Sequence, residues 1–228
     1  MKKIYFFLVA LLLTLSAGAQ TLRGDVNGDG AVDVADVTKI VNIILYGDKE
    51  EPAVDERAID LGLSVKWASC NVGATTPEEY GGYYAWGETE EKSSYNESDY
   101  LYYNTNIGND ISGTQYDVAA VQWGGSWRMP TKAEQDELRN NCTWEWTTLN
   151  GVYGYRVTGP NGNSIFLPAA GVRFGTGIHY QGSDGSFWSS SLSSSNKNYA
   201  YYTLFTEYNY IWSDNYRYDG RSVRPVCE

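Results

Sequence analysis

The sequence predicts an α+β protein with a mainly antiparallel sheet and long loops, preceded by a small loop and helix. Two observations predict this class. Over residues 58–228, glycines punctuate short apolar and aromatic segments, and only one strong helix signal interrupts them. Near the N-terminus, an acidic loop leads into an apolar pattern of helical period. We therefore expect four parts, which are residues 1–19, 20–48, 49–57 and 58–228.

The first nineteen residues have the features of a signal peptide. Lys2 and Lys3 precede an apolar run from Ile4 to Leu15, and residues 17–19 (Ala-Gly-Ala) fit the small-residue cleavage rule. No later run approaches the ~20 apolar residues that a membrane-spanning helix needs. We expect cleavage near Ala19 and a secreted protein (extracellular, at the cell surface or periplasmic) without a membrane span.

Residues 25–36 have the spacing of an EF-hand calcium loop. Oxygen ligands recur at alternate positions, and Gly30 stands where the chain must turn sharply. Closely spaced acids repel one another unless a cation compensates them, so Ca²⁺ is the predicted cofactor. The predicted ligands, the fourth through its backbone carbonyl, are Asp25, Asn27, Asp29, Ala31, Asp33 and Asp36.

An amphipathic helix is expected after this loop, ending near Gly47. Its apolar residues recur at helical spacing, and they are Val34, Val37, Ile40, Val41, Ile44 and Leu45. Loop and helix together resemble a type I dockerin repeat, whose loop also ends in Asp. The resemblance implies a cohesin-like partner. Dockerins carry two such repeats and this chain has one, so a calcium-rigidified spacer, or a helix packed on the neighbouring domain, are the alternatives.

Charge and cysteine content limit the partners. The formal net charge of −11 repels phosphate backbones and anionic lipid, which argues against nucleic acid. In an oxidising compartment, Cys70, Cys142 and Cys227 predict one disulfide with one thiol left over, and all three pairings stay open. A zinc site is not expected, because the cysteines are widely spaced and His179 is the one histidine.

A charged linker with one proline, residues 49–57, precedes the larger domain. Thr131 and Glu134 form a capping-box pattern that predicts a helix from about Lys132 to Asn140. The turn pair at residues 161–162 (Asn-Gly) predicts a hairpin. The expected strands are Leu63–Ser69, Gly82–Trp86, Gly154–Thr158, Ser164–Leu167, Phe187–Ser191, Tyr199–Thr206, Tyr210–Asp214 and Ser222–Val226. Trp144 and Trp146 would share one face of an extended segment, and whether that face is core or groove stays open.

Six short motifs occur in order within this domain. They are residues 60–68 (DLGLSVKWA), 84–88 (YAWGE), 127–131 (WRMPT), 166–171 (FLPAAG), 188–190 (WSS) and 222–226 (SVRPV). Together they resemble the Fibrobacter succinogenes major paralogous domain family of secreted proteins, over essentially all of residues 58–228. The resemblance implies a C-type lectin-like fold, which the formylglycine-generating enzymes share. It also implies chain ends that lie close together, and a ligand face built from loops and strands of the C-terminal half.

The C-terminal segment is dominated by Ser, Asn, Tyr and Asp. Tyrosine offers large amphipathic area at low entropy cost, and Ser and Asn offer adaptable hydrogen bonds, so we predict a surface that binds carbohydrate or protein. The alternative is a cross-strand tyrosine ladder that only stabilises the sheet. If Ala200, Tyr202 and Leu204 face the core, then Tyr199, Tyr201 and Thr203 face outward. The predicted ligand-binding residues are Asn196, Asn198, Tyr199, Tyr201, Tyr208, Asn209, Tyr210, Trp212, Asn215, Tyr216 and Tyr218.

Residues 193–218 also resemble the variable region of C-type lectin-like proteins that diversity-generating retroelements mutate at adenines. The resemblance implies a hypervariable surface, and a fixed tyrosine-rich segment is the alternative. Enzymatic activity is not predicted. A formylglycine-generating enzyme relies on a reactive cysteine pair that this spacing lacks, and no carboxylate spacing marks a carbohydrate-active enzyme. A structural or assembly role, docking through the repeat, is the second hypothesis.

Overall fold

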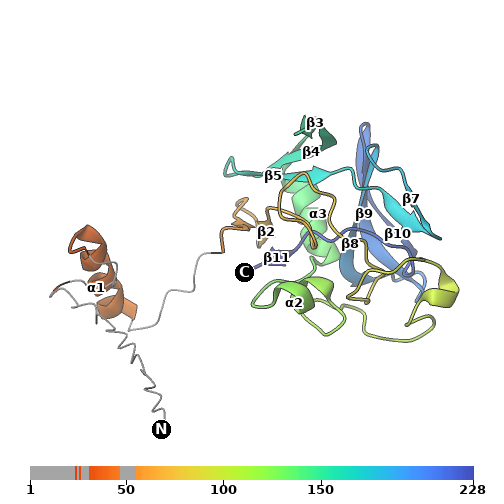
Figure 1. Ribbon diagram of the computed structural model, residues 1–228, viewed down its shortest axis with the longest axis horizontal. Helices are drawn as coiled ribbons and strands as arrows, with labels where there is room; N and C mark the ends of the chain where they lie inside the picture. Colours follow the sequence, from red (N-terminus) through yellow and green to blue (C-terminus); the bar gives the residue numbers. More distant parts are fainter. Residues whose placement is uncertain (1–23, 25, 27–30, 47–54) are drawn as a thin grey trace, which may run out of the picture. The chain divides into compact units, whose positions relative to one another are not determined.

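The computed structural model describes residues 24, 26, 31–46 and 55–228. The chain divides into two compact units, residues 1–53 and 54–228 (Figure 1). The predicted signal peptide, residues 1–19, lies outside the described residues. Within the described ranges, no helix is both long and apolar enough to cross a membrane.

The first unit contains the expected helix, α1 (Val34–Tyr46). Asp33 and Asp36 fix its start, because Asp33 Oδ1 accepts the N–H of Ala35 at 2.7 Å and Asp36 Oδ2 accepts the N–H of Asp33 at 2.8 Å. This reciprocal arrangement satisfies N–H groups that have no partner inside a helix. The apolar side of α1 is exposed at Val34, Val37, Ile40, Val41 and Ile44.

The second unit is built mainly from antiparallel sheets, so the α+β class is confirmed. Two three-stranded sheets have the orders β3-β4-β5 and β10-β9-β8, a third has the order β1-β2-β11, and β6 and β7 form a hairpin. The strands are β1 (Ala58–Ile59), β2 (Lys66–Ala68), β3 (Thr143–Leu149), β4 (Val152–Thr158), β5 (Ser164–Pro168), β6 (Val172–Phe174), β7 (Gly177–His179), β8 (Asp184–Leu192), β9 (Tyr199–Thr206), β10 (Asn209–Tyr216) and β11 (Val226–Cys227). The helices are α2 (Val118–Trp123), α3 (Lys132–Asn141) and the 3-10 turn η1 (Glu97–Asp99).

Local signals located some elements well and others badly. The structure confirms the predicted helix as α3, the strand Tyr199–Thr206 as β9, and the hairpin around residues 161–162 as β4–β5. The strand expected over residues 82–86 is wrong, because only Tyr84 forms a bridge there, with Arg221. Residues 172–179 form the β6–β7 hairpin, in which the rings of His179 and Phe174 stack.

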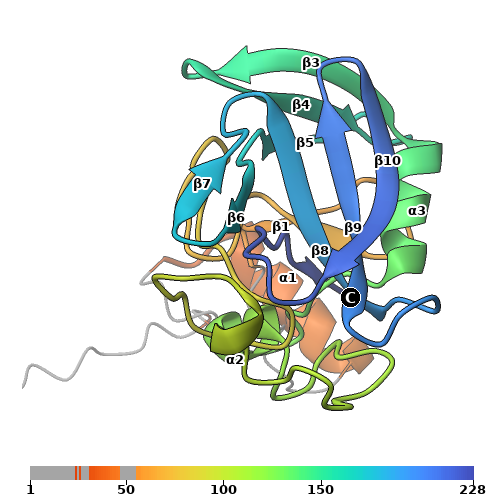
Figure 2. The same cartoon turned by 90° about the vertical axis from the view of Figure 1, so that its right-hand side faces the viewer.

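Core clusters lie on both sides of the β8–β9–β10 sheet. On one side, Phe187 and Phe205 pack with Leu138 of α3, which lies alongside the sheet (Figure 2). On the other, Trp188 and Tyr202 pack with residues of α2 and the loops. Thr203 is therefore buried, and the expectation that it faces outward is wrong. Strict in–out alternation fails because this sheet is covered on both faces.

Buried polar bonds hold the six motifs to one another. Arg224 donates to Asn71 Oδ1 at 2.8 Å and to the backbone carbonyls of Ala68, Ser69 and Phe166. The indole N–H of Trp188 donates to the carbonyl of Tyr84 at 2.8 Å. The motif residues that carry the family resemblance are thus core contacts.

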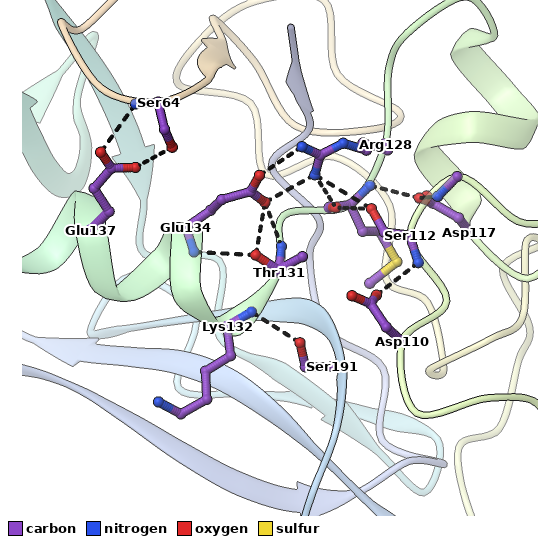
Figure 3. Close-up of polar contacts among 12 residues, drawn as sticks. Ser64, Asp110, Ser112, Asp117, Arg128, Thr131, Lys132, Glu134, Glu137 and Ser191 are labelled. Carbon is purple, nitrogen blue, oxygen red and sulfur yellow. Dashed lines mark hydrogen bonds and ion pairs between the residues drawn. The ribbon is translucent and has the colours of Figure 1, made fainter.

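The start of α3 is fixed by a polar network (Figure 3). Arg128 pairs with Glu134 at 2.6 Å, and Thr131 and Glu134 form the predicted capping box. Nearby, burial raises the pKa of Asp117, whose carboxylate accepts backbone N–H bonds, among them that of Met129 at 2.8 Å. The Lys132 side chain points away from this network (Figure 3).

The expected disulfide is wrong, since all three cysteines are free thiols. They pack in separate surroundings: Cys227 beside Trp127, Cys142 against the α3 side of the core, and Cys70 with its thiol directed to the carbonyl of Ala74. The end of the expected linker belongs to the second unit. Asp55 accepts a hydrogen bond from the Trp127 indole at 2.7 Å.

Candidate functional site

The strand register divides the predicted ligand-binding residues between two faces of the sheet. Paired residues on β9 and β10 share a face, so Tyr199, Tyr201, Tyr210, Trp212 and Tyr216 lie on one face, called here the aromatic face. The opposite face carries the other two predicted strand residues, Asn209 and Asn215. Outside the strands lie Asn196, Asn198, Tyr208 and Tyr218.

Five rings gather at one end of this face in two contact groups, Tyr199 with Tyr216 and Tyr218, and Tyr201 with Trp212; together they are called here the aromatic row. Tyr199 meets Tyr216 edge-to-face at 4.7 Å, and Tyr201 meets Trp212 at 5.5 Å. Tyr218 stacks on Tyr216 at 4.6 Å. Trp212 is 42% exposed and Tyr216 is 39% exposed, so the row combines cross-strand packing with an open surface.

Tyr210 lies on the same face but does not belong to the row. Its ring stacks on Trp144 at 4.7 Å, with an interplanar angle of 11°. It also meets Tyr155 edge-to-face within the core cluster. Trp144 therefore covers the predicted ligand residue Tyr210. Its own side chain packs against the core, which decides for Trp144 the choice between core and groove.

Polar groups surround the aromatic row. The hydroxyls of Ser193 and Ser195 donate to Asp214 Oδ2 at 2.5 and 2.7 Å, and these bonds lower the pKa of Asp214. Ser194 shares a hydrogen bond of 2.8 Å with the Tyr201 hydroxyl, which lowers the pKa of Tyr201. These contacts hold residues 193–195, called here the serine loop, against the row.

A cation from α3 completes this surface. The Lys132 ammonium lies 4.2 Å from the centre of the Trp212 ring, within the range of a cation–π interaction. The same ammonium pairs with Asp136 at 2.6 Å. Lys132 was not among the predicted site residues, because its approach to β10 is long-range and leaves no local signal.

The predicted asparagines of the loop before β9 have mainly structural contacts. Asn198 and Asn104 exchange hydrogen bonds of 3.0 and 3.1 Å, and Asn104 has a positive φ of 56°. Asn196 accepts the N–H of Asn198 at 2.9 Å, while its side chain stays exposed. The amide pair anchors this loop to the segment before α2.

Two cavities lie away from the aromatic row. One, of about 440 Å³, is lined by Trp146, Tyr153, Gly182, Ser183, Asp184, Thr206, Glu207 and Tyr208. The other, of about 210 Å³, includes Asp184 again, with Asn215, Tyr180, Asp219 and Arg221. Of these residues, only Tyr208 and Asn215 were predicted from the sequence as ligand-binding residues. For Trp146, the sequence indicated only that it shares a face with Trp144, which could be core or groove.

The structure describes only part of the loop for which calcium binding is predicted. Asp36 is buried, and its Oδ1 accepts the N–H of Val26 at 2.7 Å while Oδ2 accepts that of Asp33. The side chains of Asp33 and Asp36 and the carbonyl of Ala31 belong to the class of hard oxygen ligands that Ca²⁺ prefers. Among the described residues, no group of three or more His, Cys, Asp or Glu is arranged for a metal. The remaining predicted ligands lie outside them: Asp25, Asn27 and Asp29.

Known proteins give no further guide to these sites. No protein-family model, curated protein or solved structure matches the chain.

Proposed function

We propose that residues 58–228 form a C-type lectin-like domain of the Fibrobacter succinogenes major paralogous domain family, exported by the signal peptide. Two features support this. Strand β11 pairs with β2, so the first and last strands of the unit lie together, as the resemblance implies. Trp86, Trp188 and Arg224, each from a different motif, are fully buried.

Within this domain, we propose a non-catalytic binding function for the aromatic row. The observation that carries it is the extent of the row. A tyrosine ladder needs only cross-strand pairs, whereas Tyr218 continues the row beyond the end of β10 and stacks on the exposed Tyr216. Tyr and Trp are enriched among the residues that dominate binding energy, and exposed tyrosines beside adaptable serines are typical of antibody binding surfaces.

The arrangement of the rings favours a protein ligand over a sugar. A pyranose ring binds by stacking on an open aromatic face. In the row, Tyr218 covers one face of Tyr216 and Lys132 lies over Trp212. Ring edges and hydroxyls are thus the available surface, and these suit the side chains and backbone of a protein.

A phage-displayed peptide library selected on the chain from residue 20 tests this proposal. Enriched peptides should bind a Trp212→Ala/Tyr216→Ala double variant at least about tenfold more weakly than wild type, the loss of roughly 1.4 kcal/mol expected for an interface anchor. Tyr208→Ala, which removes an even more exposed tyrosine outside the row, should leave their affinity unchanged. Peptides that bind wild type and double variant equally would refute the proposal.

For the first unit, we propose calcium binding by the predicted loop, with docking to a cohesin-like partner as the associated prediction. When bound, Ca²⁺ would neutralise the clustered carboxylates and order the loop. Asp33→Asn is a sharp test, because the amide oxygen can still accept the Ala35 N–H that caps α1. Calorimetric titration should show weaker calcium binding for this variant, with unchanged helicity in calcium-free buffer. Equal affinity for wild type and variant would exclude Asp33 as a ligand.

A further inference from the structure

We propose that the two cavities form one groove that binds a neutral oligosaccharide. Asp184 lines both of them, so they adjoin along the sheet. The first lies between the β3–β4 hairpin and the β9–β10 turn, and the second lies between the β6–β7 hairpin and the strands β8–β10, which are neighbours in Figure 2. Volumes of about 440 and 210 Å³ together fall in the range of ligand sites, ~300–1,000 Å³.

Exposed rings line each part of the groove. Tyr208 is 87% exposed and Tyr153 is 51% exposed in the first cavity, and Tyr180 is 61% exposed in the second. The rings of Tyr208 and Tyr180 are more open than those of the aromatic row, whereas Tyr153 stacks on Trp146 at 6.1 Å. Tyr208 has no ring partner among the described residues, and Tyr180 meets only the tilted ring of His179 at 6.3 Å. Open rings of this kind can cover the C–H face of a sugar.

Polar atoms that the fold does not use lie between these rings. Asp184 Oδ1 accepts a hydrogen bond from Ser183 at 2.7 Å, whereas its Oδ2 has no hydrogen-bond partner among the described residues. The Glu207 carboxylate at the first cavity and the Asn215 side-chain nitrogen at the second also make no hydrogen bond within the described residues. Sugar hydroxyls both donate and accept, so they can bond to the carboxylates and to the amide together.

The charges of the groove favour a neutral ligand. Asp184 and Glu207 would repel an anion. At the second cavity the buried Arg221 pairs with Asp219 at 2.9 Å, so these two charges offset each other and attract neither an anion nor a cation. A basic peptide could therefore suit only the first cavity. A neutral chain of sugars suits both, with rings and hydrogen-bonding groups alternating along its length.

The groove is independent of the aromatic row and of the binding function proposed for it. Its ring residues are Trp146, Phe174, Tyr180, Tyr153, Tyr202 and Tyr208, none of which belongs to the row. One variant in each region therefore separates the two proposals. Failure of the peptide test would leave the groove untouched, and failure of a sugar test would leave the row untouched.

Calorimetric titration of the chain from residue 20 with cellohexaose, laminarihexaose, mannohexaose and xylohexaose tests the inference. At least one of these should bind with a Kd of ~1 mM or tighter. Tyr208→Ala and Asn215→Ala should each weaken it at least about fivefold, and the double variant by more than about tenfold. Trp212→Ala, the matched control in the row, should change the Kd less than about twofold.

The salt dependence of the affinity distinguishes a neutral sugar from the competing ligand, a basic peptide. Binding of a neutral sugar should be unaffected between roughly 50 and 500 mM NaCl, because no ion pair is screened. The inference is overturned if none of the four sugars binds at about 10 mM, or if Trp212→Ala weakens the sugar more than Tyr208→Ala does. It is also overturned if an arginine-rich peptide occupies the groove instead, with affinity lost in high salt and in Asp184→Asn.

Discussion

The two ends of the aromatic face differ although the same residue types line both. At the closed end, Tyr210 and Phe205 lie under Trp144 and Trp146 of β3. At the open end, Tyr199 and Tyr216 pack on each other and remain partly exposed. The difference comes from a strand some sixty residues earlier in the chain. Tyrosine content marks a surface suited to binding, but coverage by distant elements decides which tyrosines can bind.

Removing Trp144, which covers the closed end, should have the largest effect on the free energy of unfolding. Trp144→Ala deletes the stack on Tyr210 and the edge contacts with Tyr155 and Phe205. We expect the free energy of unfolding to fall by about 3 kcal/mol, near the lower limit for a large aromatic in a core. Trp212→Ala, at the open end, should lower it by no more than about 1 kcal/mol. Urea unfolding measures the free energy of unfolding of both variants. Equal losses of stability would contradict the difference proposed between the two ends.

The tyrosines themselves sharpen the comparison. Tyr210→Ala should destabilise the protein by about 2 kcal/mol, through lost apolar burial and the loss of its stacking partner. Tyr216→Ala removes exposed cross-strand contacts and should lower stability by about 0.5 kcal/mol. Thermal and urea unfolding of the two variants give the comparison directly. A larger loss for Tyr216 would mean that the row is primarily a structural ladder.

Acid should weaken the helix that covers the sheet around Thr203. Burial alone would raise the pKa of Glu134, but hydrogen bonds and charge from Arg128 and Thr131 outweigh it and lower that pKa. A lowered pKa contributes stability above the unfolded value of about 4.3, and this is lost as pH falls through the folded value.

Glu134→Gln is the matched variant, since glutamine can still complete the capping box. Its stability at neutral pH should be lower than that of wild type by about 1 kcal/mol. Between about pH 6 and pH 3 it should fall less steeply, because the titrating carboxylate is absent. Parallel pH profiles for wild type and variant would show that Glu134 contributes no pH dependence.

The smallest effect is spectroscopic and concerns tyrosine ionisation within the row. Burial raises the pKa of Tyr218 to about 12, while hydrogen bonds from Ser194 lower the pKa of Tyr201. In a titration followed by NMR of ¹³C-labelled tyrosine, Tyr201 should ionise before Tyr218. The reverse order would contradict the arrangement of the serine loop and the stacked rings.

Elements with local signals could be predicted from the sequence. The capping box at Thr131 and Glu134 located α3, and the turn at residues 161–162 located the β4–β5 hairpin. The aromatic composition identified all five rings of the row. These features depend on residues that are close in sequence, and they need no knowledge of the packing.

Features that depend on distant contacts escaped prediction. Thr203 is buried because α3 covers its face, and Tyr210 is covered by Trp144, neither of which an alternation pattern records. Composition raised the expectation of a disulfide, but composition carries no distances, and the cysteines pack in separate places. The groove needed Asp184 of β8 and Asn215 of β10, which lie opposite Thr206 and Ala200 of β9, and only the sheet register brings these strands together.

The pairing of β11 with β2, beside β1, affects how this domain can be combined with others. Because its first and last strands share a neighbour, the domain presents both ends of its chain at one place. Such a domain can be spliced into a surface loop of a host protein without stretching that loop. It can also be rejoined end to end and opened elsewhere, so circular permutants cut at an exposed turn such as residues 207–208 should still fold.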